Sequence, residues 1–336
     1  MNTVPADVEN EVVLSVVVPV FNEAESIGEF YRQVKIVLDG LKEPWEIVCV
    51  NDESSDATLS HLTSLHHADS RVKVVNLSRN FGKEIALTAG IDHACGQAII
   101  PIDADLQDPP ELIGVLVAKW REGYDIVNAT RRTRDGENWL KRTTAGAFYN
   151  VLEKMADIPI PRNTGDFRLL SRPAVNALKS MPERTRFMKG LFAWVGFKQT
   201  AVLYDRAPRH AGLSKWNYWR LWNFAIDGIA SFGTAPLKLS TYFGLCVALL
   251  AFLYALFLVG RILLYGIDVP GYASLMVVVL FLGGIQLITL GVLGEYLGRI
   301  YAETKRRPLY IVRDYYGIEA RYGIETQHGI EPKRQG

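Results

Sequence analysis

Short β-branched runs alternate with amphipathic stretches between residues 14 and 129. A run such as Leu14–Val20 (LSVVVPV) is apolar at nearly every position, which is typical of a strand buried on both faces of a sheet. The segments between such runs have apolar residues at helical spacing. This alternation predicts a mostly parallel α/β sheet covered by helices on both faces. The predicted strands are Leu14–Val20, Glu46–Val50, Val72–Leu77, Ala98–Ile102 and Asp125–Ala129, and the predicted helices are Glu25–Leu38, Ala57–His67, Lys83–His93 and Pro110–Glu122.

The C-terminal part of the chain has a different pattern, with two long runs that carry no charge. Leu239–Gly260 and Val269–Gly294 each exceed the roughly 20 residues that a helix needs to cross a bilayer. Lysine and arginine flank the pair on its outer sides, which predicts that both outer flanks are cytoplasmic. These flanking residues are Lys238, Arg299, Lys305, Arg306 and Arg307.

Two further segments lie beside these runs. Lys215–Phe232 has tryptophan and isoleucine at helical spacing on one face, which predicts a helix lying in the membrane interface. A core helix of a soluble domain would show the same spacing and remains an alternative. After the second run, Pro308–Tyr316 (PLYIVRDYY) predicts a short strand or hairpin on the cytoplasmic side.

Composition excludes several classes of protein. The net charge of +1 gives no overall basic field, so no nucleic-acid partner is expected. The three cysteines are far apart and suggest burial, without a disulfide framework. The N-terminus lacks the basic and apolar regions of a signal peptide, so the first domain is expected to stay in the cytoplasm. Neither a G-x-G-x-x-G fingerprint, a P-loop nor an H-E-x-x-H motif occurs.

An acidic pair follows the fourth predicted strand. Asp103 and Asp105 stand two residues apart where that strand ends, so both carboxylates can reach one hard divalent cation. Gln107 is placed to supply a further oxygen ligand. A solvated acidic turn is the alternative for an isolated pair of this kind, but the preceding apolar strand and the following prolines favour a metal site.

The loops after the first three predicted strands are also polar. Acidic and amide groups in Phe21–Glu23 and Asn51–Asp56 can bind a nucleobase or ribose at the same edge of the sheet. Asn22 and Asp56 can instead cap helices, and for Asp56 capping is favoured. Lys83 opens a helix after Gly82, where backbone amides favour anions, although it can equally be an ordinary surface lysine.

A basic group is predicted near the membrane. The stretch that contains Arg209, Ser214 and Lys215 directly precedes the interfacial helix, where cationic donors can bind a phosphate whose lipid tail lies in the bilayer. Arg131 and Lys189 are further cations of this group. General attraction to anionic headgroups is the alternative.

Taken together, these motifs resemble a known family. VVVPVFNEAESI, VNDESSDAT, LSRNFGKEIALTAGIDHA and PIDADLQDPPE resemble the family 2 glycosyltransferases of GT-A fold, in the polyprenyl-phosphate subset that includes dolichyl-phosphate mannose synthase. GDFRLLSR, RFMKGLFAWVGF, GLSKWNYWRLWNFAIDGI and LGVLGEYLGRIYAETKRRPLY resemble the bactoprenol glucosyltransferases used in O-antigen modification. The resemblance covers roughly residues 12 to 316. It implies a GT-A domain at 12–210, an amphipathic juxtamembrane helix at 211–234, two transmembrane helices within 235–300 (about 239–261 and 271–296) and a cytoplasmic tail at 301–336.

The resemblance also implies roles for single residues. Asp103, Asp105 and Asp166 match catalytic positions, and Asp105 and Gln107 match metal ligands. Glu53 departs from the pattern, because glycine is usual at this point of the turn, and this puts the geometry of the turn in doubt. The residues that match nucleotide-sugar positions are Pro19, Phe21, Glu23, Asp52, Lys83, Asp103 and Ala104, and those that match phosphate or acceptor positions are Arg131, Lys189, Arg209, Ser214 and Lys215.

The implied reaction transfers a sugar, with inversion, to undecaprenyl (bactoprenol) phosphate at the cytoplasmic face of a bacterial inner membrane. The favoured donor is UDP-glucose, assisted by Mg²⁺ or Mn²⁺, and the product would feed O-antigen or cell-envelope glycan modification. Mannose, a GlcNAc-type sugar or a modified arabinose are the alternative sugars. A non-catalytic membrane scaffold or a flippase component is the alternative from another class. Assembly into a homo-oligomer is left open.

Overall fold

A computed structural model describes residues 12–132, 164–181, 183–184, 186, 188–205, 235–265 and 271–318. The chain divides into two compact units, one built on a sheet and one on a pair of long helices. The predicted interfacial helix at 211–234 lies outside the described residues. The two units are described separately below.

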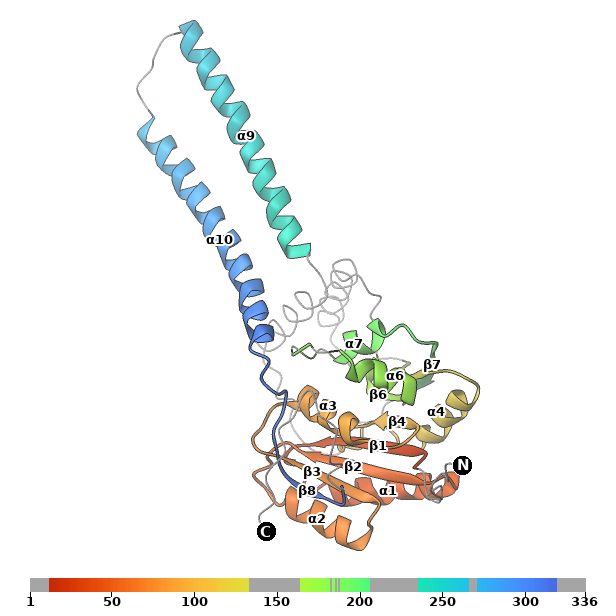
Figure 1. Ribbon diagram of the computed structural model, residues 1–336. Helices are drawn as coiled ribbons and strands as arrows, with labels where there is room; N and C mark the ends of the chain where they lie inside the picture. Colours follow the sequence, from red (N-terminus) through yellow and green to blue (C-terminus); the bar gives the residue numbers. More distant parts are fainter. Residues whose placement is uncertain are drawn as a thin grey trace, which may run out of the picture. The chain divides into compact units, whose positions relative to one another are not determined.

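The first unit is built on an eight-stranded sheet with the order β7-β5-β6-β4-β1-β2-β3-β8 (Figure 1). Strands β4, β1, β2 and β3 run parallel, as do β5 and β7, whereas β6 is antiparallel to both its neighbours. The predicted mostly parallel α/β sheet is therefore confirmed. The strands are β1 (Leu14–Val20), β2 (Trp45–Asn51), β3 (Val72–Leu77), β4 (Ala98–Pro101), β5 (Ile126–Arg131), β6 (Thr164–Ser171), β7 (Gln199–Tyr204) and β8 (Val312–Tyr316).

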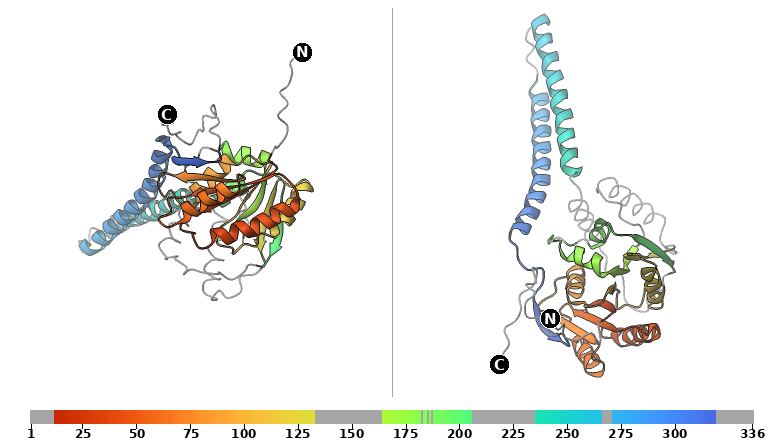
Figure 2. Two further views of the ribbon diagram at one scale, coloured as in Figure 1. Left: turned by 90° about the horizontal axis from the view of Figure 1, so that it is seen from below. Right: turned by 45° about the vertical axis from the view of Figure 1, so that its right-hand side comes forward.

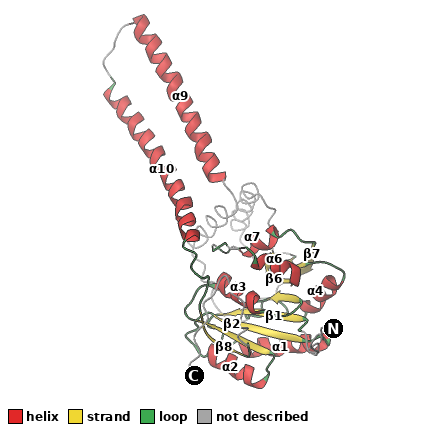
Figure 3. Cartoon of the chain, in the orientation of Figure 1, coloured by secondary structure: helices red, strands yellow, loops and turns green. Residues whose placement is uncertain are grey.

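Helices cover both faces of the sheet (Figure 3). The helices α1 (Ile27–Leu41), α2 (Thr58–Ala68) and α4 (Leu112–Arg121) contribute to one continuous core with alternate residues of the strands. The first two helices lie on the face seen in the left view of Figure 2. On α1 the buried side chains recur every three or four residues, which places them on one stripe facing the sheet.

The opposite face carries α3 (Lys83–His93), with α6 (Arg172–Lys179) and α7 (Met188–Trp194) nearby in the fold. A Cβ atom on Gly90 would overlap the side chain of Val17 and lie 3.1 Å from Val50 Cγ2. Glycine therefore lets α3 approach β1 and β2 closely. The first residue of this helix is Lys83.

The second unit contains α9 (Ala235–Tyr265) and α10 (Tyr272–Thr304). Many of their large apolar side chains are exposed, including Leu253, Phe257 and Leu287. Within the described residues, one helical segment, Val277–Thr304, is long and apolar enough to span a membrane, and Ser240–Tyr254 is a shorter apolar segment. Of the two predicted spans, only the second therefore passes this test.

The strand β8 follows α10 in sequence and joins the sheet of the first unit. It pairs antiparallel with β3, so that Asn76 is opposite Asp314 and Val74 is opposite Tyr316. Just before it, Tyr310 is buried and its hydroxyl donates to Asp92 Oδ2 on α3 (3.0 Å). The tail strand expected within 308–316 is present, but nothing in the sequence indicated that it forms the edge of this sheet.

Candidate active site

The loops that follow β1, β2, β3 and β4 meet at one edge of the sheet, because the carboxyl ends of parallel strands lie side by side. Hydrogen bonds join these loops directly. The Asn22 backbone N–H donates to Ser54 Oγ (2.9 Å), and Lys83 Nζ donates to Asp103 Oδ2 (2.8 Å). Four loops predicted separately thus form one polar cluster.

Lys83 is the centre of this cluster. Its ammonium group lies 2.8 Å from Asp103 Oδ2 and 2.6 Å from Asp166 Oδ2, so it links the β4 loop to β6. Burial by itself would lower the pKa of Lys83, but the two carboxylates outweigh it and raise the pKa above the usual range. Lys83 is therefore a fixed positive charge held between two carboxylates, although 45% of its side chain is exposed.

Asp166 is held in its charged form. Burial would raise the pKa of its carboxyl, but the positive charges of Lys83 and Lys189 prevail and lower it to about 2. Its Oδ1 atom is buried and has no hydrogen-bond partner among the described residues. Lys189, on α7, also acts on the Asp166 carboxyl through its charge. Asp166 thus has one oxygen engaged and one unused.

Behind this pair lies a carboxyl that sequence reasoning missed. Glu84 is next to Lys83 on α3, and its Oε2 is buried without a partner in the described part of the chain. Burial, together with the charge of Asp166, raises the pKa of Glu84 to about 7. Its only sequence signal is its position in the first turn of a helix, where glutamate is common.

The two aspartates of the loop after β4, Asp103 and Asp105, have different hydrogen-bond partners. Asp103 is engaged by Lys83, whereas the one hydrogen bond to Asp105 among the described residues comes from the backbone N–H of Gln107 to Oδ1 (3.1 Å). The Gln107 side chain is buried, and its Oε1 has no hydrogen-bond partner within the described ranges. An unused amide oxygen beside a carboxylate suits a hard cation that takes its other ligands from water and substrate phosphates. No group of three or more His, Cys, Asp or Glu residues that could hold a metal occurs in the described residues.

A second buried group orients Arg131 at the end of β5. Arg131 Nε donates to the Tyr204 hydroxyl (3.3 Å), and that hydroxyl donates in turn to Asp108 Oδ1. Arg131 Nη2 also lies 3.8 Å from the same carboxylate. Burial lowers the pKa of Arg131, but Tyr204 and Asp108 reverse the shift and raise it. From the sequence, no role was predicted for Tyr204 or Asp108. Tyr204 ends a strand and belongs to no motif, and Asp108 lies in the run PIDADLQDPPE after the acidic pair without a role of its own.

Asp52 braces the loop after β3. Its two carboxylate oxygens accept from the backbone N–H groups of Phe81 (2.7 Å) and Gly82 (2.9 Å). The amides at the start of α3, expected from sequence to favour an anion, are thus engaged by this carboxylate. Gly82 has a φ of 95°, a conformation that glycine adopts readily.

Glu53 keeps the left-handed turn that glycine usually makes at this point. Its φ is 57°, and its Oε2 accepts from the Asn80 backbone N–H (2.9 Å). Asp56 Oδ1 accepts from the N–H of Thr58 (3.0 Å), but the N-cap residue of α2 is Ala57, which makes no side-chain cap hydrogen bond. The departure at position 53 therefore leaves the turn intact, and the side chain adds a contact that glycine lacks.

The other residues predicted to bind a nucleotide sugar surround these loops. The Phe21 side chain is 48% exposed beside the cluster, while Ala104 is buried and Pro19 is half-buried at the end of β1. Burial raises the pKa of Glu23, opposed by the hydrogen bond from Ser26, and the charges of Asp105 and Asp103 raise it further. Glu23 therefore lies near the acidic pair. Arg209, Ser214 and Lys215 lie outside the described residues.

Comparisons with known proteins identify the family of the chain. Residues 15–179 match the family model "Glycosyl transferase family 2", and residues 235–300 match "GtrB C-terminal hairpin". An uncharacterized glycosyltransferase of Synechocystis sp. is 61% identical over 91% of this chain and 96% of its own length. The bactoprenol glucosyl transferase of Shigella phage SfV is 51% identical over 90% of this chain and 98% of its own.

Among solved structures, mannosyl-3-phosphoglycerate synthase from Rubrobacter xylanophilus aligns at 19% identity with a TM-score of 0.46, covering 64% of this chain and 71% of that one. The relatives above match nearly the whole chain at far higher identity. Because both of these relatives are at least 51% identical over at least 90% of the chain, the chain belongs to glycosyl transferase family 2 and is a glycosyltransferase.

Proposed function

We propose that this protein transfers glucose from UDP-glucose to a polyprenyl phosphate, with inversion at the sugar carbon. The observation that carries the proposal is the 51% identity to a bactoprenol glucosyl transferase over 90% of the chain, which includes the helical hairpin as well as the sheet. A relative that matched only the sheet would leave the acceptor open.

The donor would bind across the loops after β1, β2 and β4. Phe21 offers an exposed ring, and Glu23 and Asp103 lie at the same edge of the sheet. Lys83 provides a cation at the centre of the cluster, where a departing diphosphate needs its negative charge stabilised. These contacts support a nucleoside diphosphate sugar as the donor.

Asp105 and Gln107 would hold a divalent cation, Mg²⁺ or Mn²⁺. The unused buried Oε1 of Gln107 and the Asp105 carboxylate are oxygen ligands, and the diphosphate would complete the set. When bound, such a cation neutralises charge that develops on the leaving diphosphate.

Asp166 would orient cations and would not take a proton. Its pKa of about 2 makes it a weak base near neutral pH. The acceptor needs no strong base, because a phosphate monoester has a second pKa of about 6 and is already largely charged. Asp166 instead fixes Lys83, while Arg131, held by Tyr204, offers a second cation.

The acceptor would reach the site from the cytoplasmic side of a bacterial inner membrane. Under this proposal α9 and α10 both cross the bilayer, and Arg209, Ser214 and Lys215 bind the lipid phosphate together with Arg131 and Lys189. The long apolar helix α10 and the match of residues 235–300 to the hairpin family support the membrane part of the proposal.

A donor panel tests the reaction. Purified full-length protein in detergent would be given undecaprenyl phosphate and radiolabelled UDP-glucose, GDP-mannose, UDP-GlcNAc or a nucleotide-activated arabinose, and the extracted lipid would be identified by mass spectrometry. Glucosyl-phosphoryl lipid from UDP-glucose is expected. Transfer of another sugar would correct the donor, and transfer of none would overturn the proposal.

The acceptor site has its own test. The double substitution Arg209→Ala with Lys215→Ala should raise KM for undecaprenyl phosphate more than KM for UDP-glucose, because a phosphate loses two cationic partners. The opposite ranking would move these residues to the donor side.

A further inference from the structure

The edge strand β8 is tied to the loops of the site by side chains as well as by its backbone. The Ser78 backbone N–H donates to Ile311 O (2.9 Å), just beyond the paired part of β3. Two neighbouring side chains, Arg313 and Asp314, then contact residues of β3 and the loops beyond it. Each begins a separate line of contacts.

The first line passes through two buried asparagines. Asn76 Nδ2 donates to Asp314 Oδ2 (2.9 Å), and Asn51 Nδ2 donates to Asn76 Oδ1 (2.8 Å). Asn51 Oδ1 then accepts from the Ser54 N–H (3.3 Å), and Ser54 Oγ accepts from the Asn22 N–H (2.9 Å). Hydrogen bonds thus run without a break from β8 to the loop after β1.

The second line is shorter. Arg313 Nη2 donates to Ser78 O (2.8 Å) and lies 3.8 Å from Glu53 Oε1. The other oxygen of the Glu53 carboxylate accepts from the Asn80 N–H (2.9 Å). This line therefore joins β8 to the loops after β2 and β3.

The first line ends at Asn22 and the second passes through Glu53, and both of these residues have a left-handed backbone conformation. Asn22 has a φ of 56° and Glu53 a φ of 57°. Asparagine adopts this left-handed conformation more readily than other residues with a side chain, so the strain is greater at Glu53. The amides of Asn51 and Asn76 are each only 2% exposed, so a lost partner would leave a buried polar group unpaired. The strained turns are thus stabilised by contacts that continue to β8.

We propose that Arg313 and Asp314 are positioning residues for the donor site, because β8 fixes the loops that bind the nucleoside diphosphate. The inference rests on the proposed function for the role of these loops. It also means that the site is completed by residues that follow both α9 and α10 in the sequence, so a chain that ends after α10 lacks part of the support for its donor loops.

The test uses the full-length protein in detergent and measures the Kd for UDP by calorimetry. Asp314→Ala should raise the Kd for UDP and the KM for the donor about tenfold, which is the expected effect of leaving one buried amide unpaired. The kcat and the KM for lipid phosphate should not change. Asp314→Asn should restore binding, since its amide oxygen can still accept from Asn76. Arg313→Ala should weaken UDP binding by a smaller factor, because this side chain is exposed.

Ile311→Ala is the matched control, because its side chain is exposed and its backbone hydrogen bond remains. Unchanged UDP affinity in both Asp314→Ala and Arg313→Ala would overturn the inference, as would an equal loss in the control. If Asp314→Ala does not fold, the Arg313 variant and the conservative Asp314→Asn decide the matter.

A separate readout distinguishes this inference from the proposed function. Hydrogen exchange of peptides covering residues 51–56 and 78–82 should be faster in Asp314→Ala than in wild type, whatever the donor sugar or acceptor is. Unchanged exchange would count against the role of β8. If wild type binds UDP but transfers no sugar, the proposed function is overturned and the inference about β8 is not. If wild type binds GDP, ADP or TDP more tightly than UDP, the Kd of each variant is measured with that nucleotide instead.

Discussion

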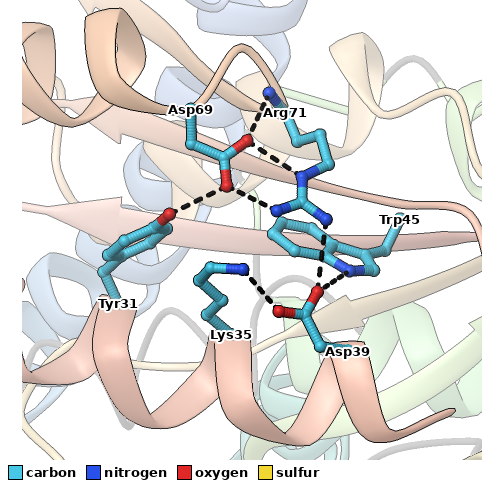
Figure 4. Close-up of polar contacts among 6 residues, drawn as sticks. All are labelled: Tyr31, Lys35, Asp39, Trp45, Asp69 and Arg71. Atoms are coloured by element: carbon cyan, nitrogen blue, oxygen red, sulfur yellow. Dashed lines mark hydrogen bonds and ion pairs between the residues drawn. The ribbon is translucent and has the colours of Figure 1, made fainter. Parts of the chain in front are cut away.

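The two ends of the parallel strands use their charged residues differently. At the amino ends, a network joins α1 to the starts of β2 and β3 (Figure 4). Arg71 donates to Asp69 through Nε (2.9 Å) and Nη2 (2.7 Å), and Tyr31 donates to the same carboxylate (2.8 Å). The Arg71 guanidinium lies 3.7 Å from the ring centroid of Trp45, whose Nε1 donates to Asp39 (3.0 Å). Lys35 pairs with the other Asp39 oxygen.

At the carboxyl ends, several polar atoms lack partners among the described residues. They include Asp166 Oδ1, Gln107 Oε1 and Glu84 Oε2. At the amino ends, Arg71 lowers the pKa of Asp69 and Lys35 lowers that of Asp39. At the carboxyl ends, burial raises the pKa values of Glu23, Asp52 and Glu84. Asp166 is the exception there, because the charges of Lys83 and Lys189 outweigh burial and lower its pKa. The amino end therefore pairs its charged groups with one another, whereas the carboxyl end keeps buried polar atoms that have no partner in the described part of the chain. Such unmet groups are typical of functional sites.

The largest expected effect is at Asp105. Asp105→Ala should reduce sugar transfer by at least about 100-fold, because a charged oxygen ligand for the cation is lost, and EDTA should do the same to wild type. The Tm should stay within a degree or two, since the hydrogen bond that Asp105 accepts among the described residues is a local backbone one. Asp69→Asn is the matched control at the other end, and there we expect a lower Tm with unchanged transfer. Normal transfer by Asp105→Ala would show that the comparison is wrong.

Asp166→Asn should reduce kcat by about 10- to 100-fold at saturating acceptor, because Lys83 loses one of its two carboxylate partners and its position. Steady-state kinetics at saturating acceptor measure this. A drop confined to alkaline or acidic pH would indicate a proton-transfer role, and full turnover would remove Asp166 from the mechanism.

Arg71→Ala should have the reverse signature. Removing the Arg71 side chain breaks its hydrogen bonds to Asp69, but this side chain is 40% exposed to solvent. We therefore expect the free energy of unfolding to fall by about 1–2 kcal/mol, which lowers Tm by roughly 2–6 °C. Thermal unfolding of the full-length protein measures it, and transfer activity should be retained. Arg132→Ala is the control, because its contact with Asp205 is exposed and long at 4.0 Å. A loss of transfer without a loss of Tm would contradict the division between the two ends.

The smallest effect concerns pH. A carboxyl whose pKa rises on folding binds more protons when folded, so stability falls as pH rises from the ordinary value toward the folded one. For Glu84 this window runs from 4.5 to about 7. Glu84→Gln should therefore match wild type in Tm near pH 4 and exceed it by a few degrees near pH 8, in about the range that one buried charge produces. Parallel Tm curves would show that Glu84 stays charged.

Asp69 should behave in the opposite way. Its pKa is lowered by Arg71, so its contribution is complete above the ordinary carboxyl pKa and is lost as pH falls below it. The contribution of the Asp69 network to stability is thus lost in acid, whereas the contribution of Glu84 is lost as the pH rises toward neutral. A Tm curve of Asp69→Asn that converges with wild type only in acid would confirm this sign.

Much of the sheet could be predicted from sequence, because local patterns determine it. The strands Leu14–Val20 and Val72–Leu77 and the helix Lys83–His93 occur with the predicted ends, and the other elements before residue 130 differ by only a few residues. Strands buried on both faces are continuously apolar, and such runs can be recognised without knowing their neighbours. The loops after the strands could be placed at one edge, because the carboxyl ends of parallel strands lie side by side.

The contacts inside the site could not be predicted, because they join residues far apart in the chain. Asp105 and Gln107 were found from spacing, but the bridge from Lys83 to Asp166 spans two motifs and depends on how α3 packs against the sheet. Asp52 was expected to face a nucleotide, and its carboxylate instead binds the amides of Phe81 and Gly82; its contact with a donor stays a prediction.

The sequence by itself determined the family, the alternation of strand and helix, and the acidic pair, since each depends on residues close together in the chain. Only the tertiary structure decided that β8 closes the sheet beside β3 and that Asp314 is connected through two asparagines to the loop of Asn22. The physical reason is that an edge strand's partner is chosen by backbone groups left unpaired on β3, and backbone groups are the same in every residue.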